Sequence, residues 1–258
     1  MDAVHPLIGV AFGISQIVYL ATIFTLGVRL GLRARARREL AEGLLAAHFI
    51  LCAGLGYLLI SLGLGASRSP GTLPANATAW LLGSGYFFSN LGVLAAIAFN
   101  RLVFRPQAGW AHVAVWLSAA ALLVGCVGYG LGGGFSHGRF EGPWFWLFYG
   151  TILTGIGWVM VEPLLYYRQM RRRRALGLAD PMLVNRFALW SVGSTCRWLM
   201  VATGAVTGGV MEGNVSVTFT LTGTALLGLG VAVSYWLTFF PGAAYRRFIL
   251  RRAERLRA

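Results

Sequence analysis

The chain has 258 residues, of which 57% are hydrophobic and 12% are charged. Soluble globular domains carry about 25% charged residues, so this composition excludes an ordinary soluble domain and indicates a protein of the lipid bilayer. The formal net charge of +14 would fit a nucleic-acid-binding protein only if the basic residues formed a compact folded module. They are spread along the chain beside apolar segments instead, and we expect no nucleic-acid partner.

Seven apolar stretches follow one another along the chain, each close to the roughly 20 residues that a helix needs to cross the hydrocarbon core. Lipid offers the backbone amides no hydrogen-bond partners, whereas a helix pairs them within its own segment. The sequence therefore predicts an all-α membrane protein, a seven-transmembrane-helix bundle. The expected spans are Leu7 to Leu30, Ala41 to Leu64, Ala79 to Phe99, Trp110 to Leu131, Trp144 to Tyr167, Met182 to Val206 and Val217 to Phe240.

Arginines gather on alternate sides of these spans: after the first, third, fifth and seventh, with four in a row at residues 171–174. Basic residues beside spans stay on the cytoplasmic side. We therefore expect the N-terminus outside and the C-terminus in the cytoplasm, with a seven-helix transmembrane domain over residues 1–245 and a basic cytoplasmic tail over residues 246–258. The basic loops should contact anionic lipid headgroups, and they could also present a surface to a cytoplasmic partner protein.

An internal repeat is suggested by residues 14–51, which align without a gap on residues 152–189 and pair Phe49 with Phe187. Two three-helix units joined by a fourth helix would form a parallel repeat. This three-plus-one-plus-three topology resembles that of SWEET-type transporters and of the seven-helix opsins. The opsin resemblance implies a lysine in the last helix that binds retinal, but the chain contains no lysine. A covalent retinal protein is excluded, and the all-arginine usage indicates a GC-rich bacterial genome and hence a bacterial inner membrane.

Ionisable side chains inside a span are costly in lipid, so they are the first candidates for a site. Glu162 lies near the end of the fifth span and Arg186 near the start of the sixth, both roughly 7 to 9 Å below the same membrane surface. We expect these two side chains to pair. The pair would either pin one helix to the other or take part in binding a carboxylate or in proton coupling.

His48 enters the second span from the same side and reaches about 10 to 12 Å deep. It would be a hydrogen-bonded packing residue, a proton carrier or a haem ligand. Haem b is disfavoured because His112 lies too close to the surface to be the facing axial ligand. Asn100 and Asn185 lie near this end and would either join helices or line the same pocket.

Arg197 lies some 15 residues into the sixth span, in its outer half, where no carboxylate stands at the same depth. It would snorkel outward, pair with an acidic residue of the outer loops (Asp2, Glu141 or Glu212), or bind an anionic ligand in an outward-facing cavity. Polar side chains that could line such a cavity are Gln16, Tyr86 and Thr195.

Catalysis has little support, because a hydrolase needs a nucleophile with a base in reach or a metal with several ligands. Four histidines are spread over both membrane faces, and a single carboxylate is well inside a span. We expect no enzyme, no metal and no cofactor. Two hypotheses remain: a non-catalytic ligand- or stimulus-sensing protein that acts through its cytoplasmic basic loops, and a small-molecule transporter built from two three-helix halves.

Overall fold

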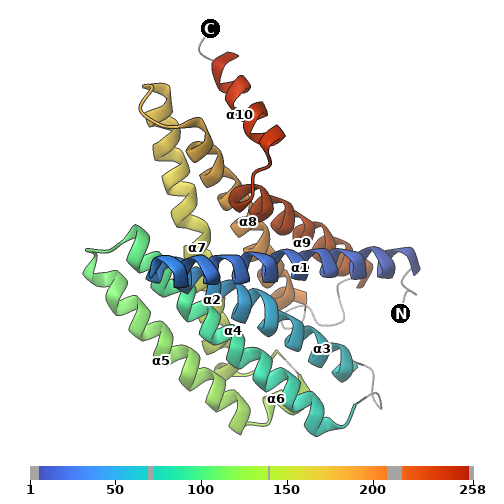
Figure 1. The fold of residues 1–258 in the computed structure, drawn as a ribbon. Helices are drawn as coiled ribbons and strands as arrows, with labels where there is room; N and C mark the ends of the chain where they lie inside the picture. The colour runs from blue at the N-terminus through green and yellow to red at the C-terminus, as the bar shows by residue number, and fades with distance from the viewer. Residues whose placement is uncertain (1–5, 69–72, 139, 208–216, 256–258) are drawn as a thin grey trace.

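The structure, a computed structural model, describes residues 6–68, 73–138, 140–207 and 217–255 (Figure 1). All regular structure in these residues is helical. The elements are α1 (Pro6–Arg37), α2 (Leu40–Ala47), η1 (His48–Gly56), α3 (Tyr57–Arg68), α4 (Ala75–Phe104), α5 (Gly109–Leu131), α6 (Gly134–His137), α7 (Pro143–Ala175), α8 (Pro181–Ala205), α9 (Val217–Phe239) and α10 (Ala243–Arg255).

Six helical segments in the described residues are long and apolar enough to cross a membrane: α1, the continuous α2, η1 and α3, and then α4, α5, α7 and α9. Multiple apolar helices of this length indicate a multi-pass membrane protein. The sixth expected span also forms a helix, α8, of 25 residues. It is not among the six, and it carries Asn185, Arg186 and Arg197. In the described residues six helices meet the length and composition of a membrane span, so the predicted number of seven spans is not confirmed and stays a prediction.

The long helices pack in chain order (Figure 1): α1 on α2, η1 and α9, α4 on α5 and α7, α7 on α8, and α8 on α9. The contact of α9 with α1 brings the last long helix back to the first. Of the six apolar helices α4 is the most buried, and it touches α2, η1, α3, α5 and α7. This arrangement leaves a core between α1, η1, α8 and α9.

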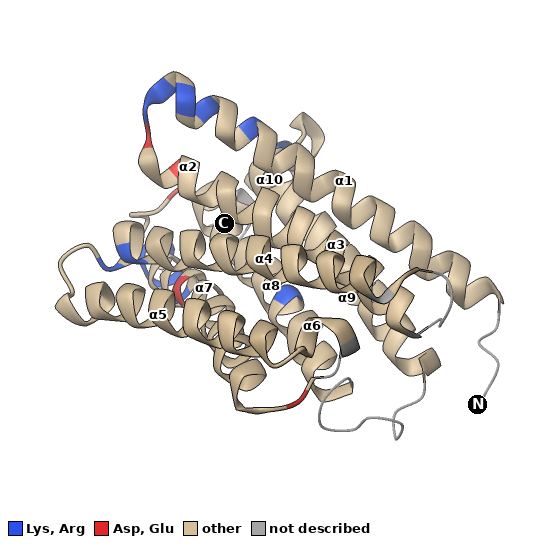
Figure 2. Cartoon of the chain, turned by 90° about the horizontal axis from the view of Figure 1, so that it is seen from below, with Lys and Arg blue, Asp and Glu red and all other residues tan. Residues whose placement is uncertain are grey.

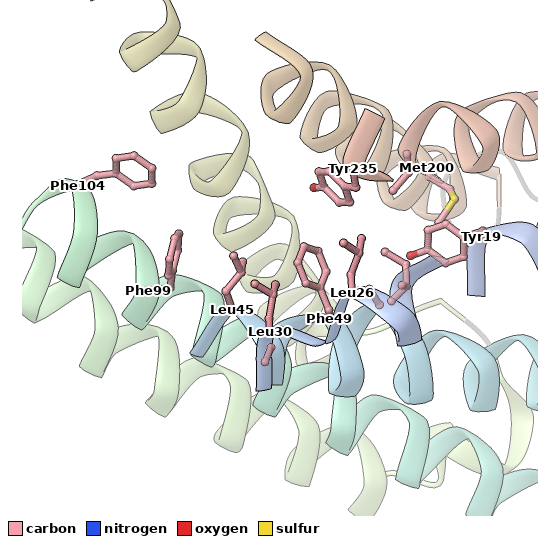
Figure 3. Close-up of a cluster of buried hydrophobic side chains, with 13 residues drawn as sticks. Tyr19, Leu26, Leu30, Leu45, Phe49, Phe99, Phe104, Met200 and Tyr235 are labelled. Carbon is pink, nitrogen blue, oxygen red and sulfur yellow. The ribbon is translucent and has the colours of Figure 1, made fainter. Parts of the chain in front are cut away.

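Two clusters of buried hydrophobic residues fill the bundle. The first joins α1, α2, η1, α4, α8 and α9, and Figure 3 shows Phe49 pointing between Leu26 and Tyr235. The Phe49 and Tyr235 rings meet edge to face with centroids 5.3 Å apart. The second cluster lies between α4, α5 and α7 and contains Tyr86, Phe145 and Phe148. The helices are therefore held by two aromatic cores rather than by one.

The segment expected as one uniform helix from Ala41 to Leu64 contains nine residues of π-helix, η1. The wider turn allows α4 to approach closely: a Cβ added to Gly92 would collide with the backbone of Cys52, and one added to Gly56 would lie 2.8 Å from the backbone N of Ser89. π-Helical turns inside α-helices are frequent at functional sites. At residues 186–194, which the proposed repeat aligns with η1, the chain is α-helical, and the repeat stays a prediction.

Basic residues gather at one end of the bundle, at the C-terminal ends of α1, α4 and α7, and Figure 2 shows these blue segments together. The α7 helix ends at Ala175, and Gly177, two residues further on, has a φ of +74°, which favours glycine. Asp180 then caps α8 by accepting a hydrogen bond of 3.0 Å from the backbone N–H of Met182. Figure 2 also shows one blue segment of α8 far from the basic end, inside the bundle.

Candidate functional site

A buried arginine stands at the centre of the candidate site. The Arg197 side chain, on α8, is 3% exposed. One terminal nitrogen donates a hydrogen bond to the hydroxyl oxygen of Tyr19 on α1, and the other donates to the sulfur of Cys52 on η1 at 3.0 Å. Arg197 therefore joins three helices, and it does not snorkel toward the membrane surface as one of the sequence expectations held.

Polar side chains extend from this centre on two sides. The rings of Tyr19 and Tyr57 meet edge to face at 5.3 Å, and the Tyr57 hydroxyl donates a 2.6 Å hydrogen bond to Oε1 of Gln16. On the other side, the sulfur of Cys52 lies 3.5 Å from the hydroxyl of Ser89 on α4. We call Gln16, Tyr19, Cys52, Tyr57, Ser89 and Arg197 the central polar cluster.

The central polar cluster holds a positive charge with no counter-charge among the residues that the structure describes. Arg197 forms no ion pair with the acidic side chains that the structure describes, and two of its expected partners, Asp2 and Glu212, lie outside the described residues. Its Nε and the Nε2 of Gln16 are buried and have no hydrogen-bond partner. Guanidinium does not lose its proton in proteins, and a buried charge costs several kcal/mol unless it is paired, on the order given by ion desolvation. The cluster therefore favours an anion.

His48 fixes η1 to α4. The side chain is fully enclosed, and its Nδ1 lies 3.0 Å from the carbonyl oxygen of Gly92. Because a carbonyl only accepts, Nδ1 carries the proton and donates. This geometry supports the packing interpretation of His48 that the sequence left open.

Glu162 does not pair with Arg186, contrary to the sequence prediction. Its Oε1 accepts from Nε of Arg105 at 2.8 Å and from the indole N–H of Trp158 at 2.9 Å, and its Oε2 accepts from Arg105 at 3.3 Å. Arg105 caps the C-terminus of α4, so this pair joins α7 to α4. The sequence predicted the same depth below the membrane surface for Glu162 and Arg186. Depth alone, however, does not determine which face of its helix each residue occupies.

The remaining predicted residues lie apart from Arg197. Thr195 donates to the carbonyl oxygen of Ser191 in its own helix, and Tyr86 packs with Phe148 in the second aromatic cluster. Asn185 forms hydrogen bonds with the Tyr245 hydroxyl at 3.0 and 3.2 Å, which ties α8 to α10.

Asn100, on α4, is fully buried and has no hydrogen-bond partner for either amide atom. Of the predicted ligand-site residues, the structure thus brings only Gln16 and Arg197 into one cluster.

Tyr19, Cys52 and Tyr57 belong to the central polar cluster but were not among the predicted site residues. Tyrosine and cysteine inside an apolar span are ordinary packing residues, so only their convergence on Arg197 distinguishes them. No three His, Cys, Asp or Glu side chains within the described ranges lie close enough together to hold a metal ion.

Comparisons of the chain with protein-family models, with curated proteins and with solved structures gave no match.

Proposed function

We propose that the chain is a seven-helix membrane receptor without catalytic activity, and that its ligand binds Arg197 through a carboxylate. The observation that carries this proposal is a permanently charged guanidinium that is buried among neutral side chains in an apolar bundle. A carboxylate can accept two parallel hydrogen bonds from such a group. In this proposal α8 is the seventh membrane crossing, because Arg197, the charged residue in the middle of the helix, faces protein rather than lipid, while the exposed Arg186 lies near the start of the helix.

Signalling in this proposal depends on what Arg197 holds together. A carboxylate that takes over its terminal N–H groups releases Tyr19 on α1 and Cys52 on η1, and it thereby changes how α8 packs on both. A ligand shifts an equilibrium only by its differential affinity for two states, and these exchanged hydrogen bonds supply that difference. The arginine-rich end of the bundle then presents a changed surface to lipid headgroups or to a cytoplasmic partner protein. The proposed location is the inner membrane of a bacterium.

The test measures the thermal unfolding of the detergent-purified chain in the presence of acetate, lactate, succinate or benzoate. Each carboxylate is compared with its uncharged amide. We expect at least one carboxylate to raise the midpoint of thermal unfolding of the wild-type protein, and neither its amide nor the R197Q variant to respond. A ligand bound at a concentration of 100 times Kd stabilises by about 2.7 kcal/mol. Equal shifts in wild type and R197Q would remove Arg197 from the site and overturn the proposal.

Transport is the alternative, and one observation favours it. Arg197 belongs to the second half of the chain, and its partners Tyr19 and Cys52 belong to the first half. Transporter sites commonly lie at the interface between two halves. Proteoliposomes that accumulate a radiolabelled carboxylate, with accumulation lost in R197Q, would replace the receptor proposal by this one.

A further inference from the structure

A second cationic feature lies at the basic end of the bundle, away from the central polar cluster. It is a groove of about 240 Å³ between α1, α8 and α9. The residues that line it are Arg33, Leu183, Arg186, Phe187, Trp190, Thr238 and Phe239. The groove combines two guanidinium groups with an aromatic wall.

The two arginines differ in their pairing. Arg33 on α1 forms an ion pair with Glu42 at 3.1 Å, and both side chains remain partly accessible to solvent. Arg186 on α8 is exposed and forms no ion pair with any acidic group that the structure describes. Two guanidinium groups with one carboxylate leave a net positive charge at the mouth of the groove, which favours an anionic occupant.

The aromatic wall lies one helical turn beyond Arg186. Trp190 follows Arg186 by four positions, so both project from the same face of α8. The rings of Phe187 and Trp190 are parallel, with centroids 6.4 Å apart, and Phe239 of α9 lies 6.0 Å from Trp190. The groove is thus charged at its mouth and apolar further along the helix.

With α8 as a membrane crossing, as proposed above, the groove would lie near the boundary between headgroups and acyl chains. Arg186 is the sixth residue of α8, which places it about 7 to 8 Å from the start of the helix at a rise of 1.5 Å per residue. The headgroup layer of each leaflet is about 5 to 8 Å thick. Arginine also reaches toward the surface with its long side chain. If α8 crosses the membrane as proposed above and begins at its surface, the guanidinium group lies at phosphate level and Trp190 at the level of the first acyl carbons.

We propose that this groove binds one anionic phospholipid, with its phosphate on Arg186 and Arg33 and the upper part of one acyl chain against Leu183 and Trp190. The groove, about 240 Å³ in volume, has room for several water-sized groups, as a phosphate and its glycerol require. Because the lipid bridges α1 and α8, it stabilises the contact between the first and sixth long helices.

The experiment is native mass spectrometry of the delipidated full-length chain with phosphatidylglycerol or with phosphatidylcholine of the same acyl chains. We expect one phosphatidylglycerol to bind to wild type at least tenfold more tightly than phosphatidylcholine. The R33Q/R186Q variant should lose this preference. The matched control R171Q/R172Q, which removes two exposed arginines at the same end of the bundle, should keep it.

A groove-filling variant and a competition with inorganic phosphate complete the experiment. Leu183→Trp fills the groove without changing its charge and should also abolish the one-to-one adduct, even if the double arginine variant does not fold. Equal loss in R171Q/R172Q would assign the binding to general surface charge and overturn the proposal. Displacement of the lipid by inorganic phosphate would make the site one for a free oxyanion, and the lipid proposal would then be wrong.

Discussion

Arg197 of α8 donates a hydrogen bond to the Tyr19 hydroxyl of α1, although 178 positions separate the two residues in the sequence. This contact joins the sixth long helix to the first across the core. Helix α9 packs on both α8 and α1. The hydrogen bond therefore adds a direct link between two helices that α9 already joins. The stability of the bundle should therefore depend on this pair.

Tyr19→Phe removes the acceptor and leaves a buried guanidinium N–H unpaired, which should lower the free energy of unfolding by about 1 to 3 kcal/mol. The double variant Y19F/R197M removes both polar groups, and we expect it to be more stable than Y19F alone, since an apolar pair leaves nothing unsatisfied. Unfolding in mixed detergent, followed by circular dichroism, gives the comparison. A double variant that is less stable than Y19F would show that the charge itself stabilises the fold.

Cys52→Asp places a carboxylate next to Arg197. If the cluster is built to accept a carboxylate, the added ion pair raises the unfolding midpoint of the otherwise wild-type chain and abolishes its response to added carboxylates. The same substitution in R197Q should destabilise, because the new charge is then buried alone. The four proteins form a double-mutant cycle, and a coupling free energy near zero would mean that residue 52 does not reach the guanidinium.

The Glu162 and Arg105 pair predicts an unequal response. Glu162 is 2% exposed, whereas the Arg105 side chain is 40% exposed. Arg105→Gln strands a buried carboxylate and should cost about 3 kcal/mol or more. Glu162→Gln leaves an arginine that water can solvate, and the cost should be about 1 kcal/mol.

Thermal unfolding measures both of these variants, with R168Q on the exposed face of α7 as the control. Equal losses in E162Q and R105Q would contradict the burial difference. The charge-exchanged protein E162R/R105E should regain little of the stability that R105Q loses, because it buries the larger guanidinium where the carboxylate lay.

Two glycines should respond differently to replacement by alanine. A Cβ on Gly92 would collide with the backbone of Cys52, whereas nothing lies within 4 Å of a Cβ on Gly65. Gly92→Ala must push η1 away from α4 and should destabilise by about 1 to 3 kcal/mol, the range of overpacked cores. Gly65→Ala should be neutral or gain up to about 1 kcal/mol of helix propensity. The sign of the two shifts in unfolding midpoint is the measurement.

Single cysteines test the orientation. Leu176 follows the last residue of α7 at the basic end of the bundle and is 73% exposed. Leu131 is the last residue of α5, at the other end of the bundle, and is 86% exposed. With the native cysteines replaced by alanine, a membrane-impermeant maleimide should label L131C in intact cells and L176C only in inverted vesicles. The reverse pattern would place the arginines outside, contrary to the positive-inside distribution.

The helical segments could be predicted from the sequence because lipid imposes a minimum apolar length and paired backbone amides. The expected spans lie within the observed helices apart from Val206 and Phe240 at their ends, and α1, α4 and α7 continue into their arginine-rich ends. The π-helical turn of η1 could not be predicted, because it depends on how Gly92 of α4 packs against Cys52 rather than on local composition.

The candidate site was predicted in part. Arg197 stands out in any sequence of this kind, since charge inside a span is rare. Its direction was not determined, because the apolar spans are hydrophobic on all sides and show no face that marks the interior. For the same reason Glu162 was assigned to Arg186, which stands at the same depth, while the residue that it contacts is Arg105 at the cap of α4.

The burial of Arg197 has an electrical consequence. A lysine in its place could lose its proton, but a guanidinium keeps its charge at any physiological pH. If α8 moved along the membrane normal it would carry this charge through part of the transmembrane field, which is worth about 2.3 kcal/mol per elementary charge for a full crossing at 100 mV. The balance between conformations that place Arg197 at different depths would then follow the voltage across the membrane.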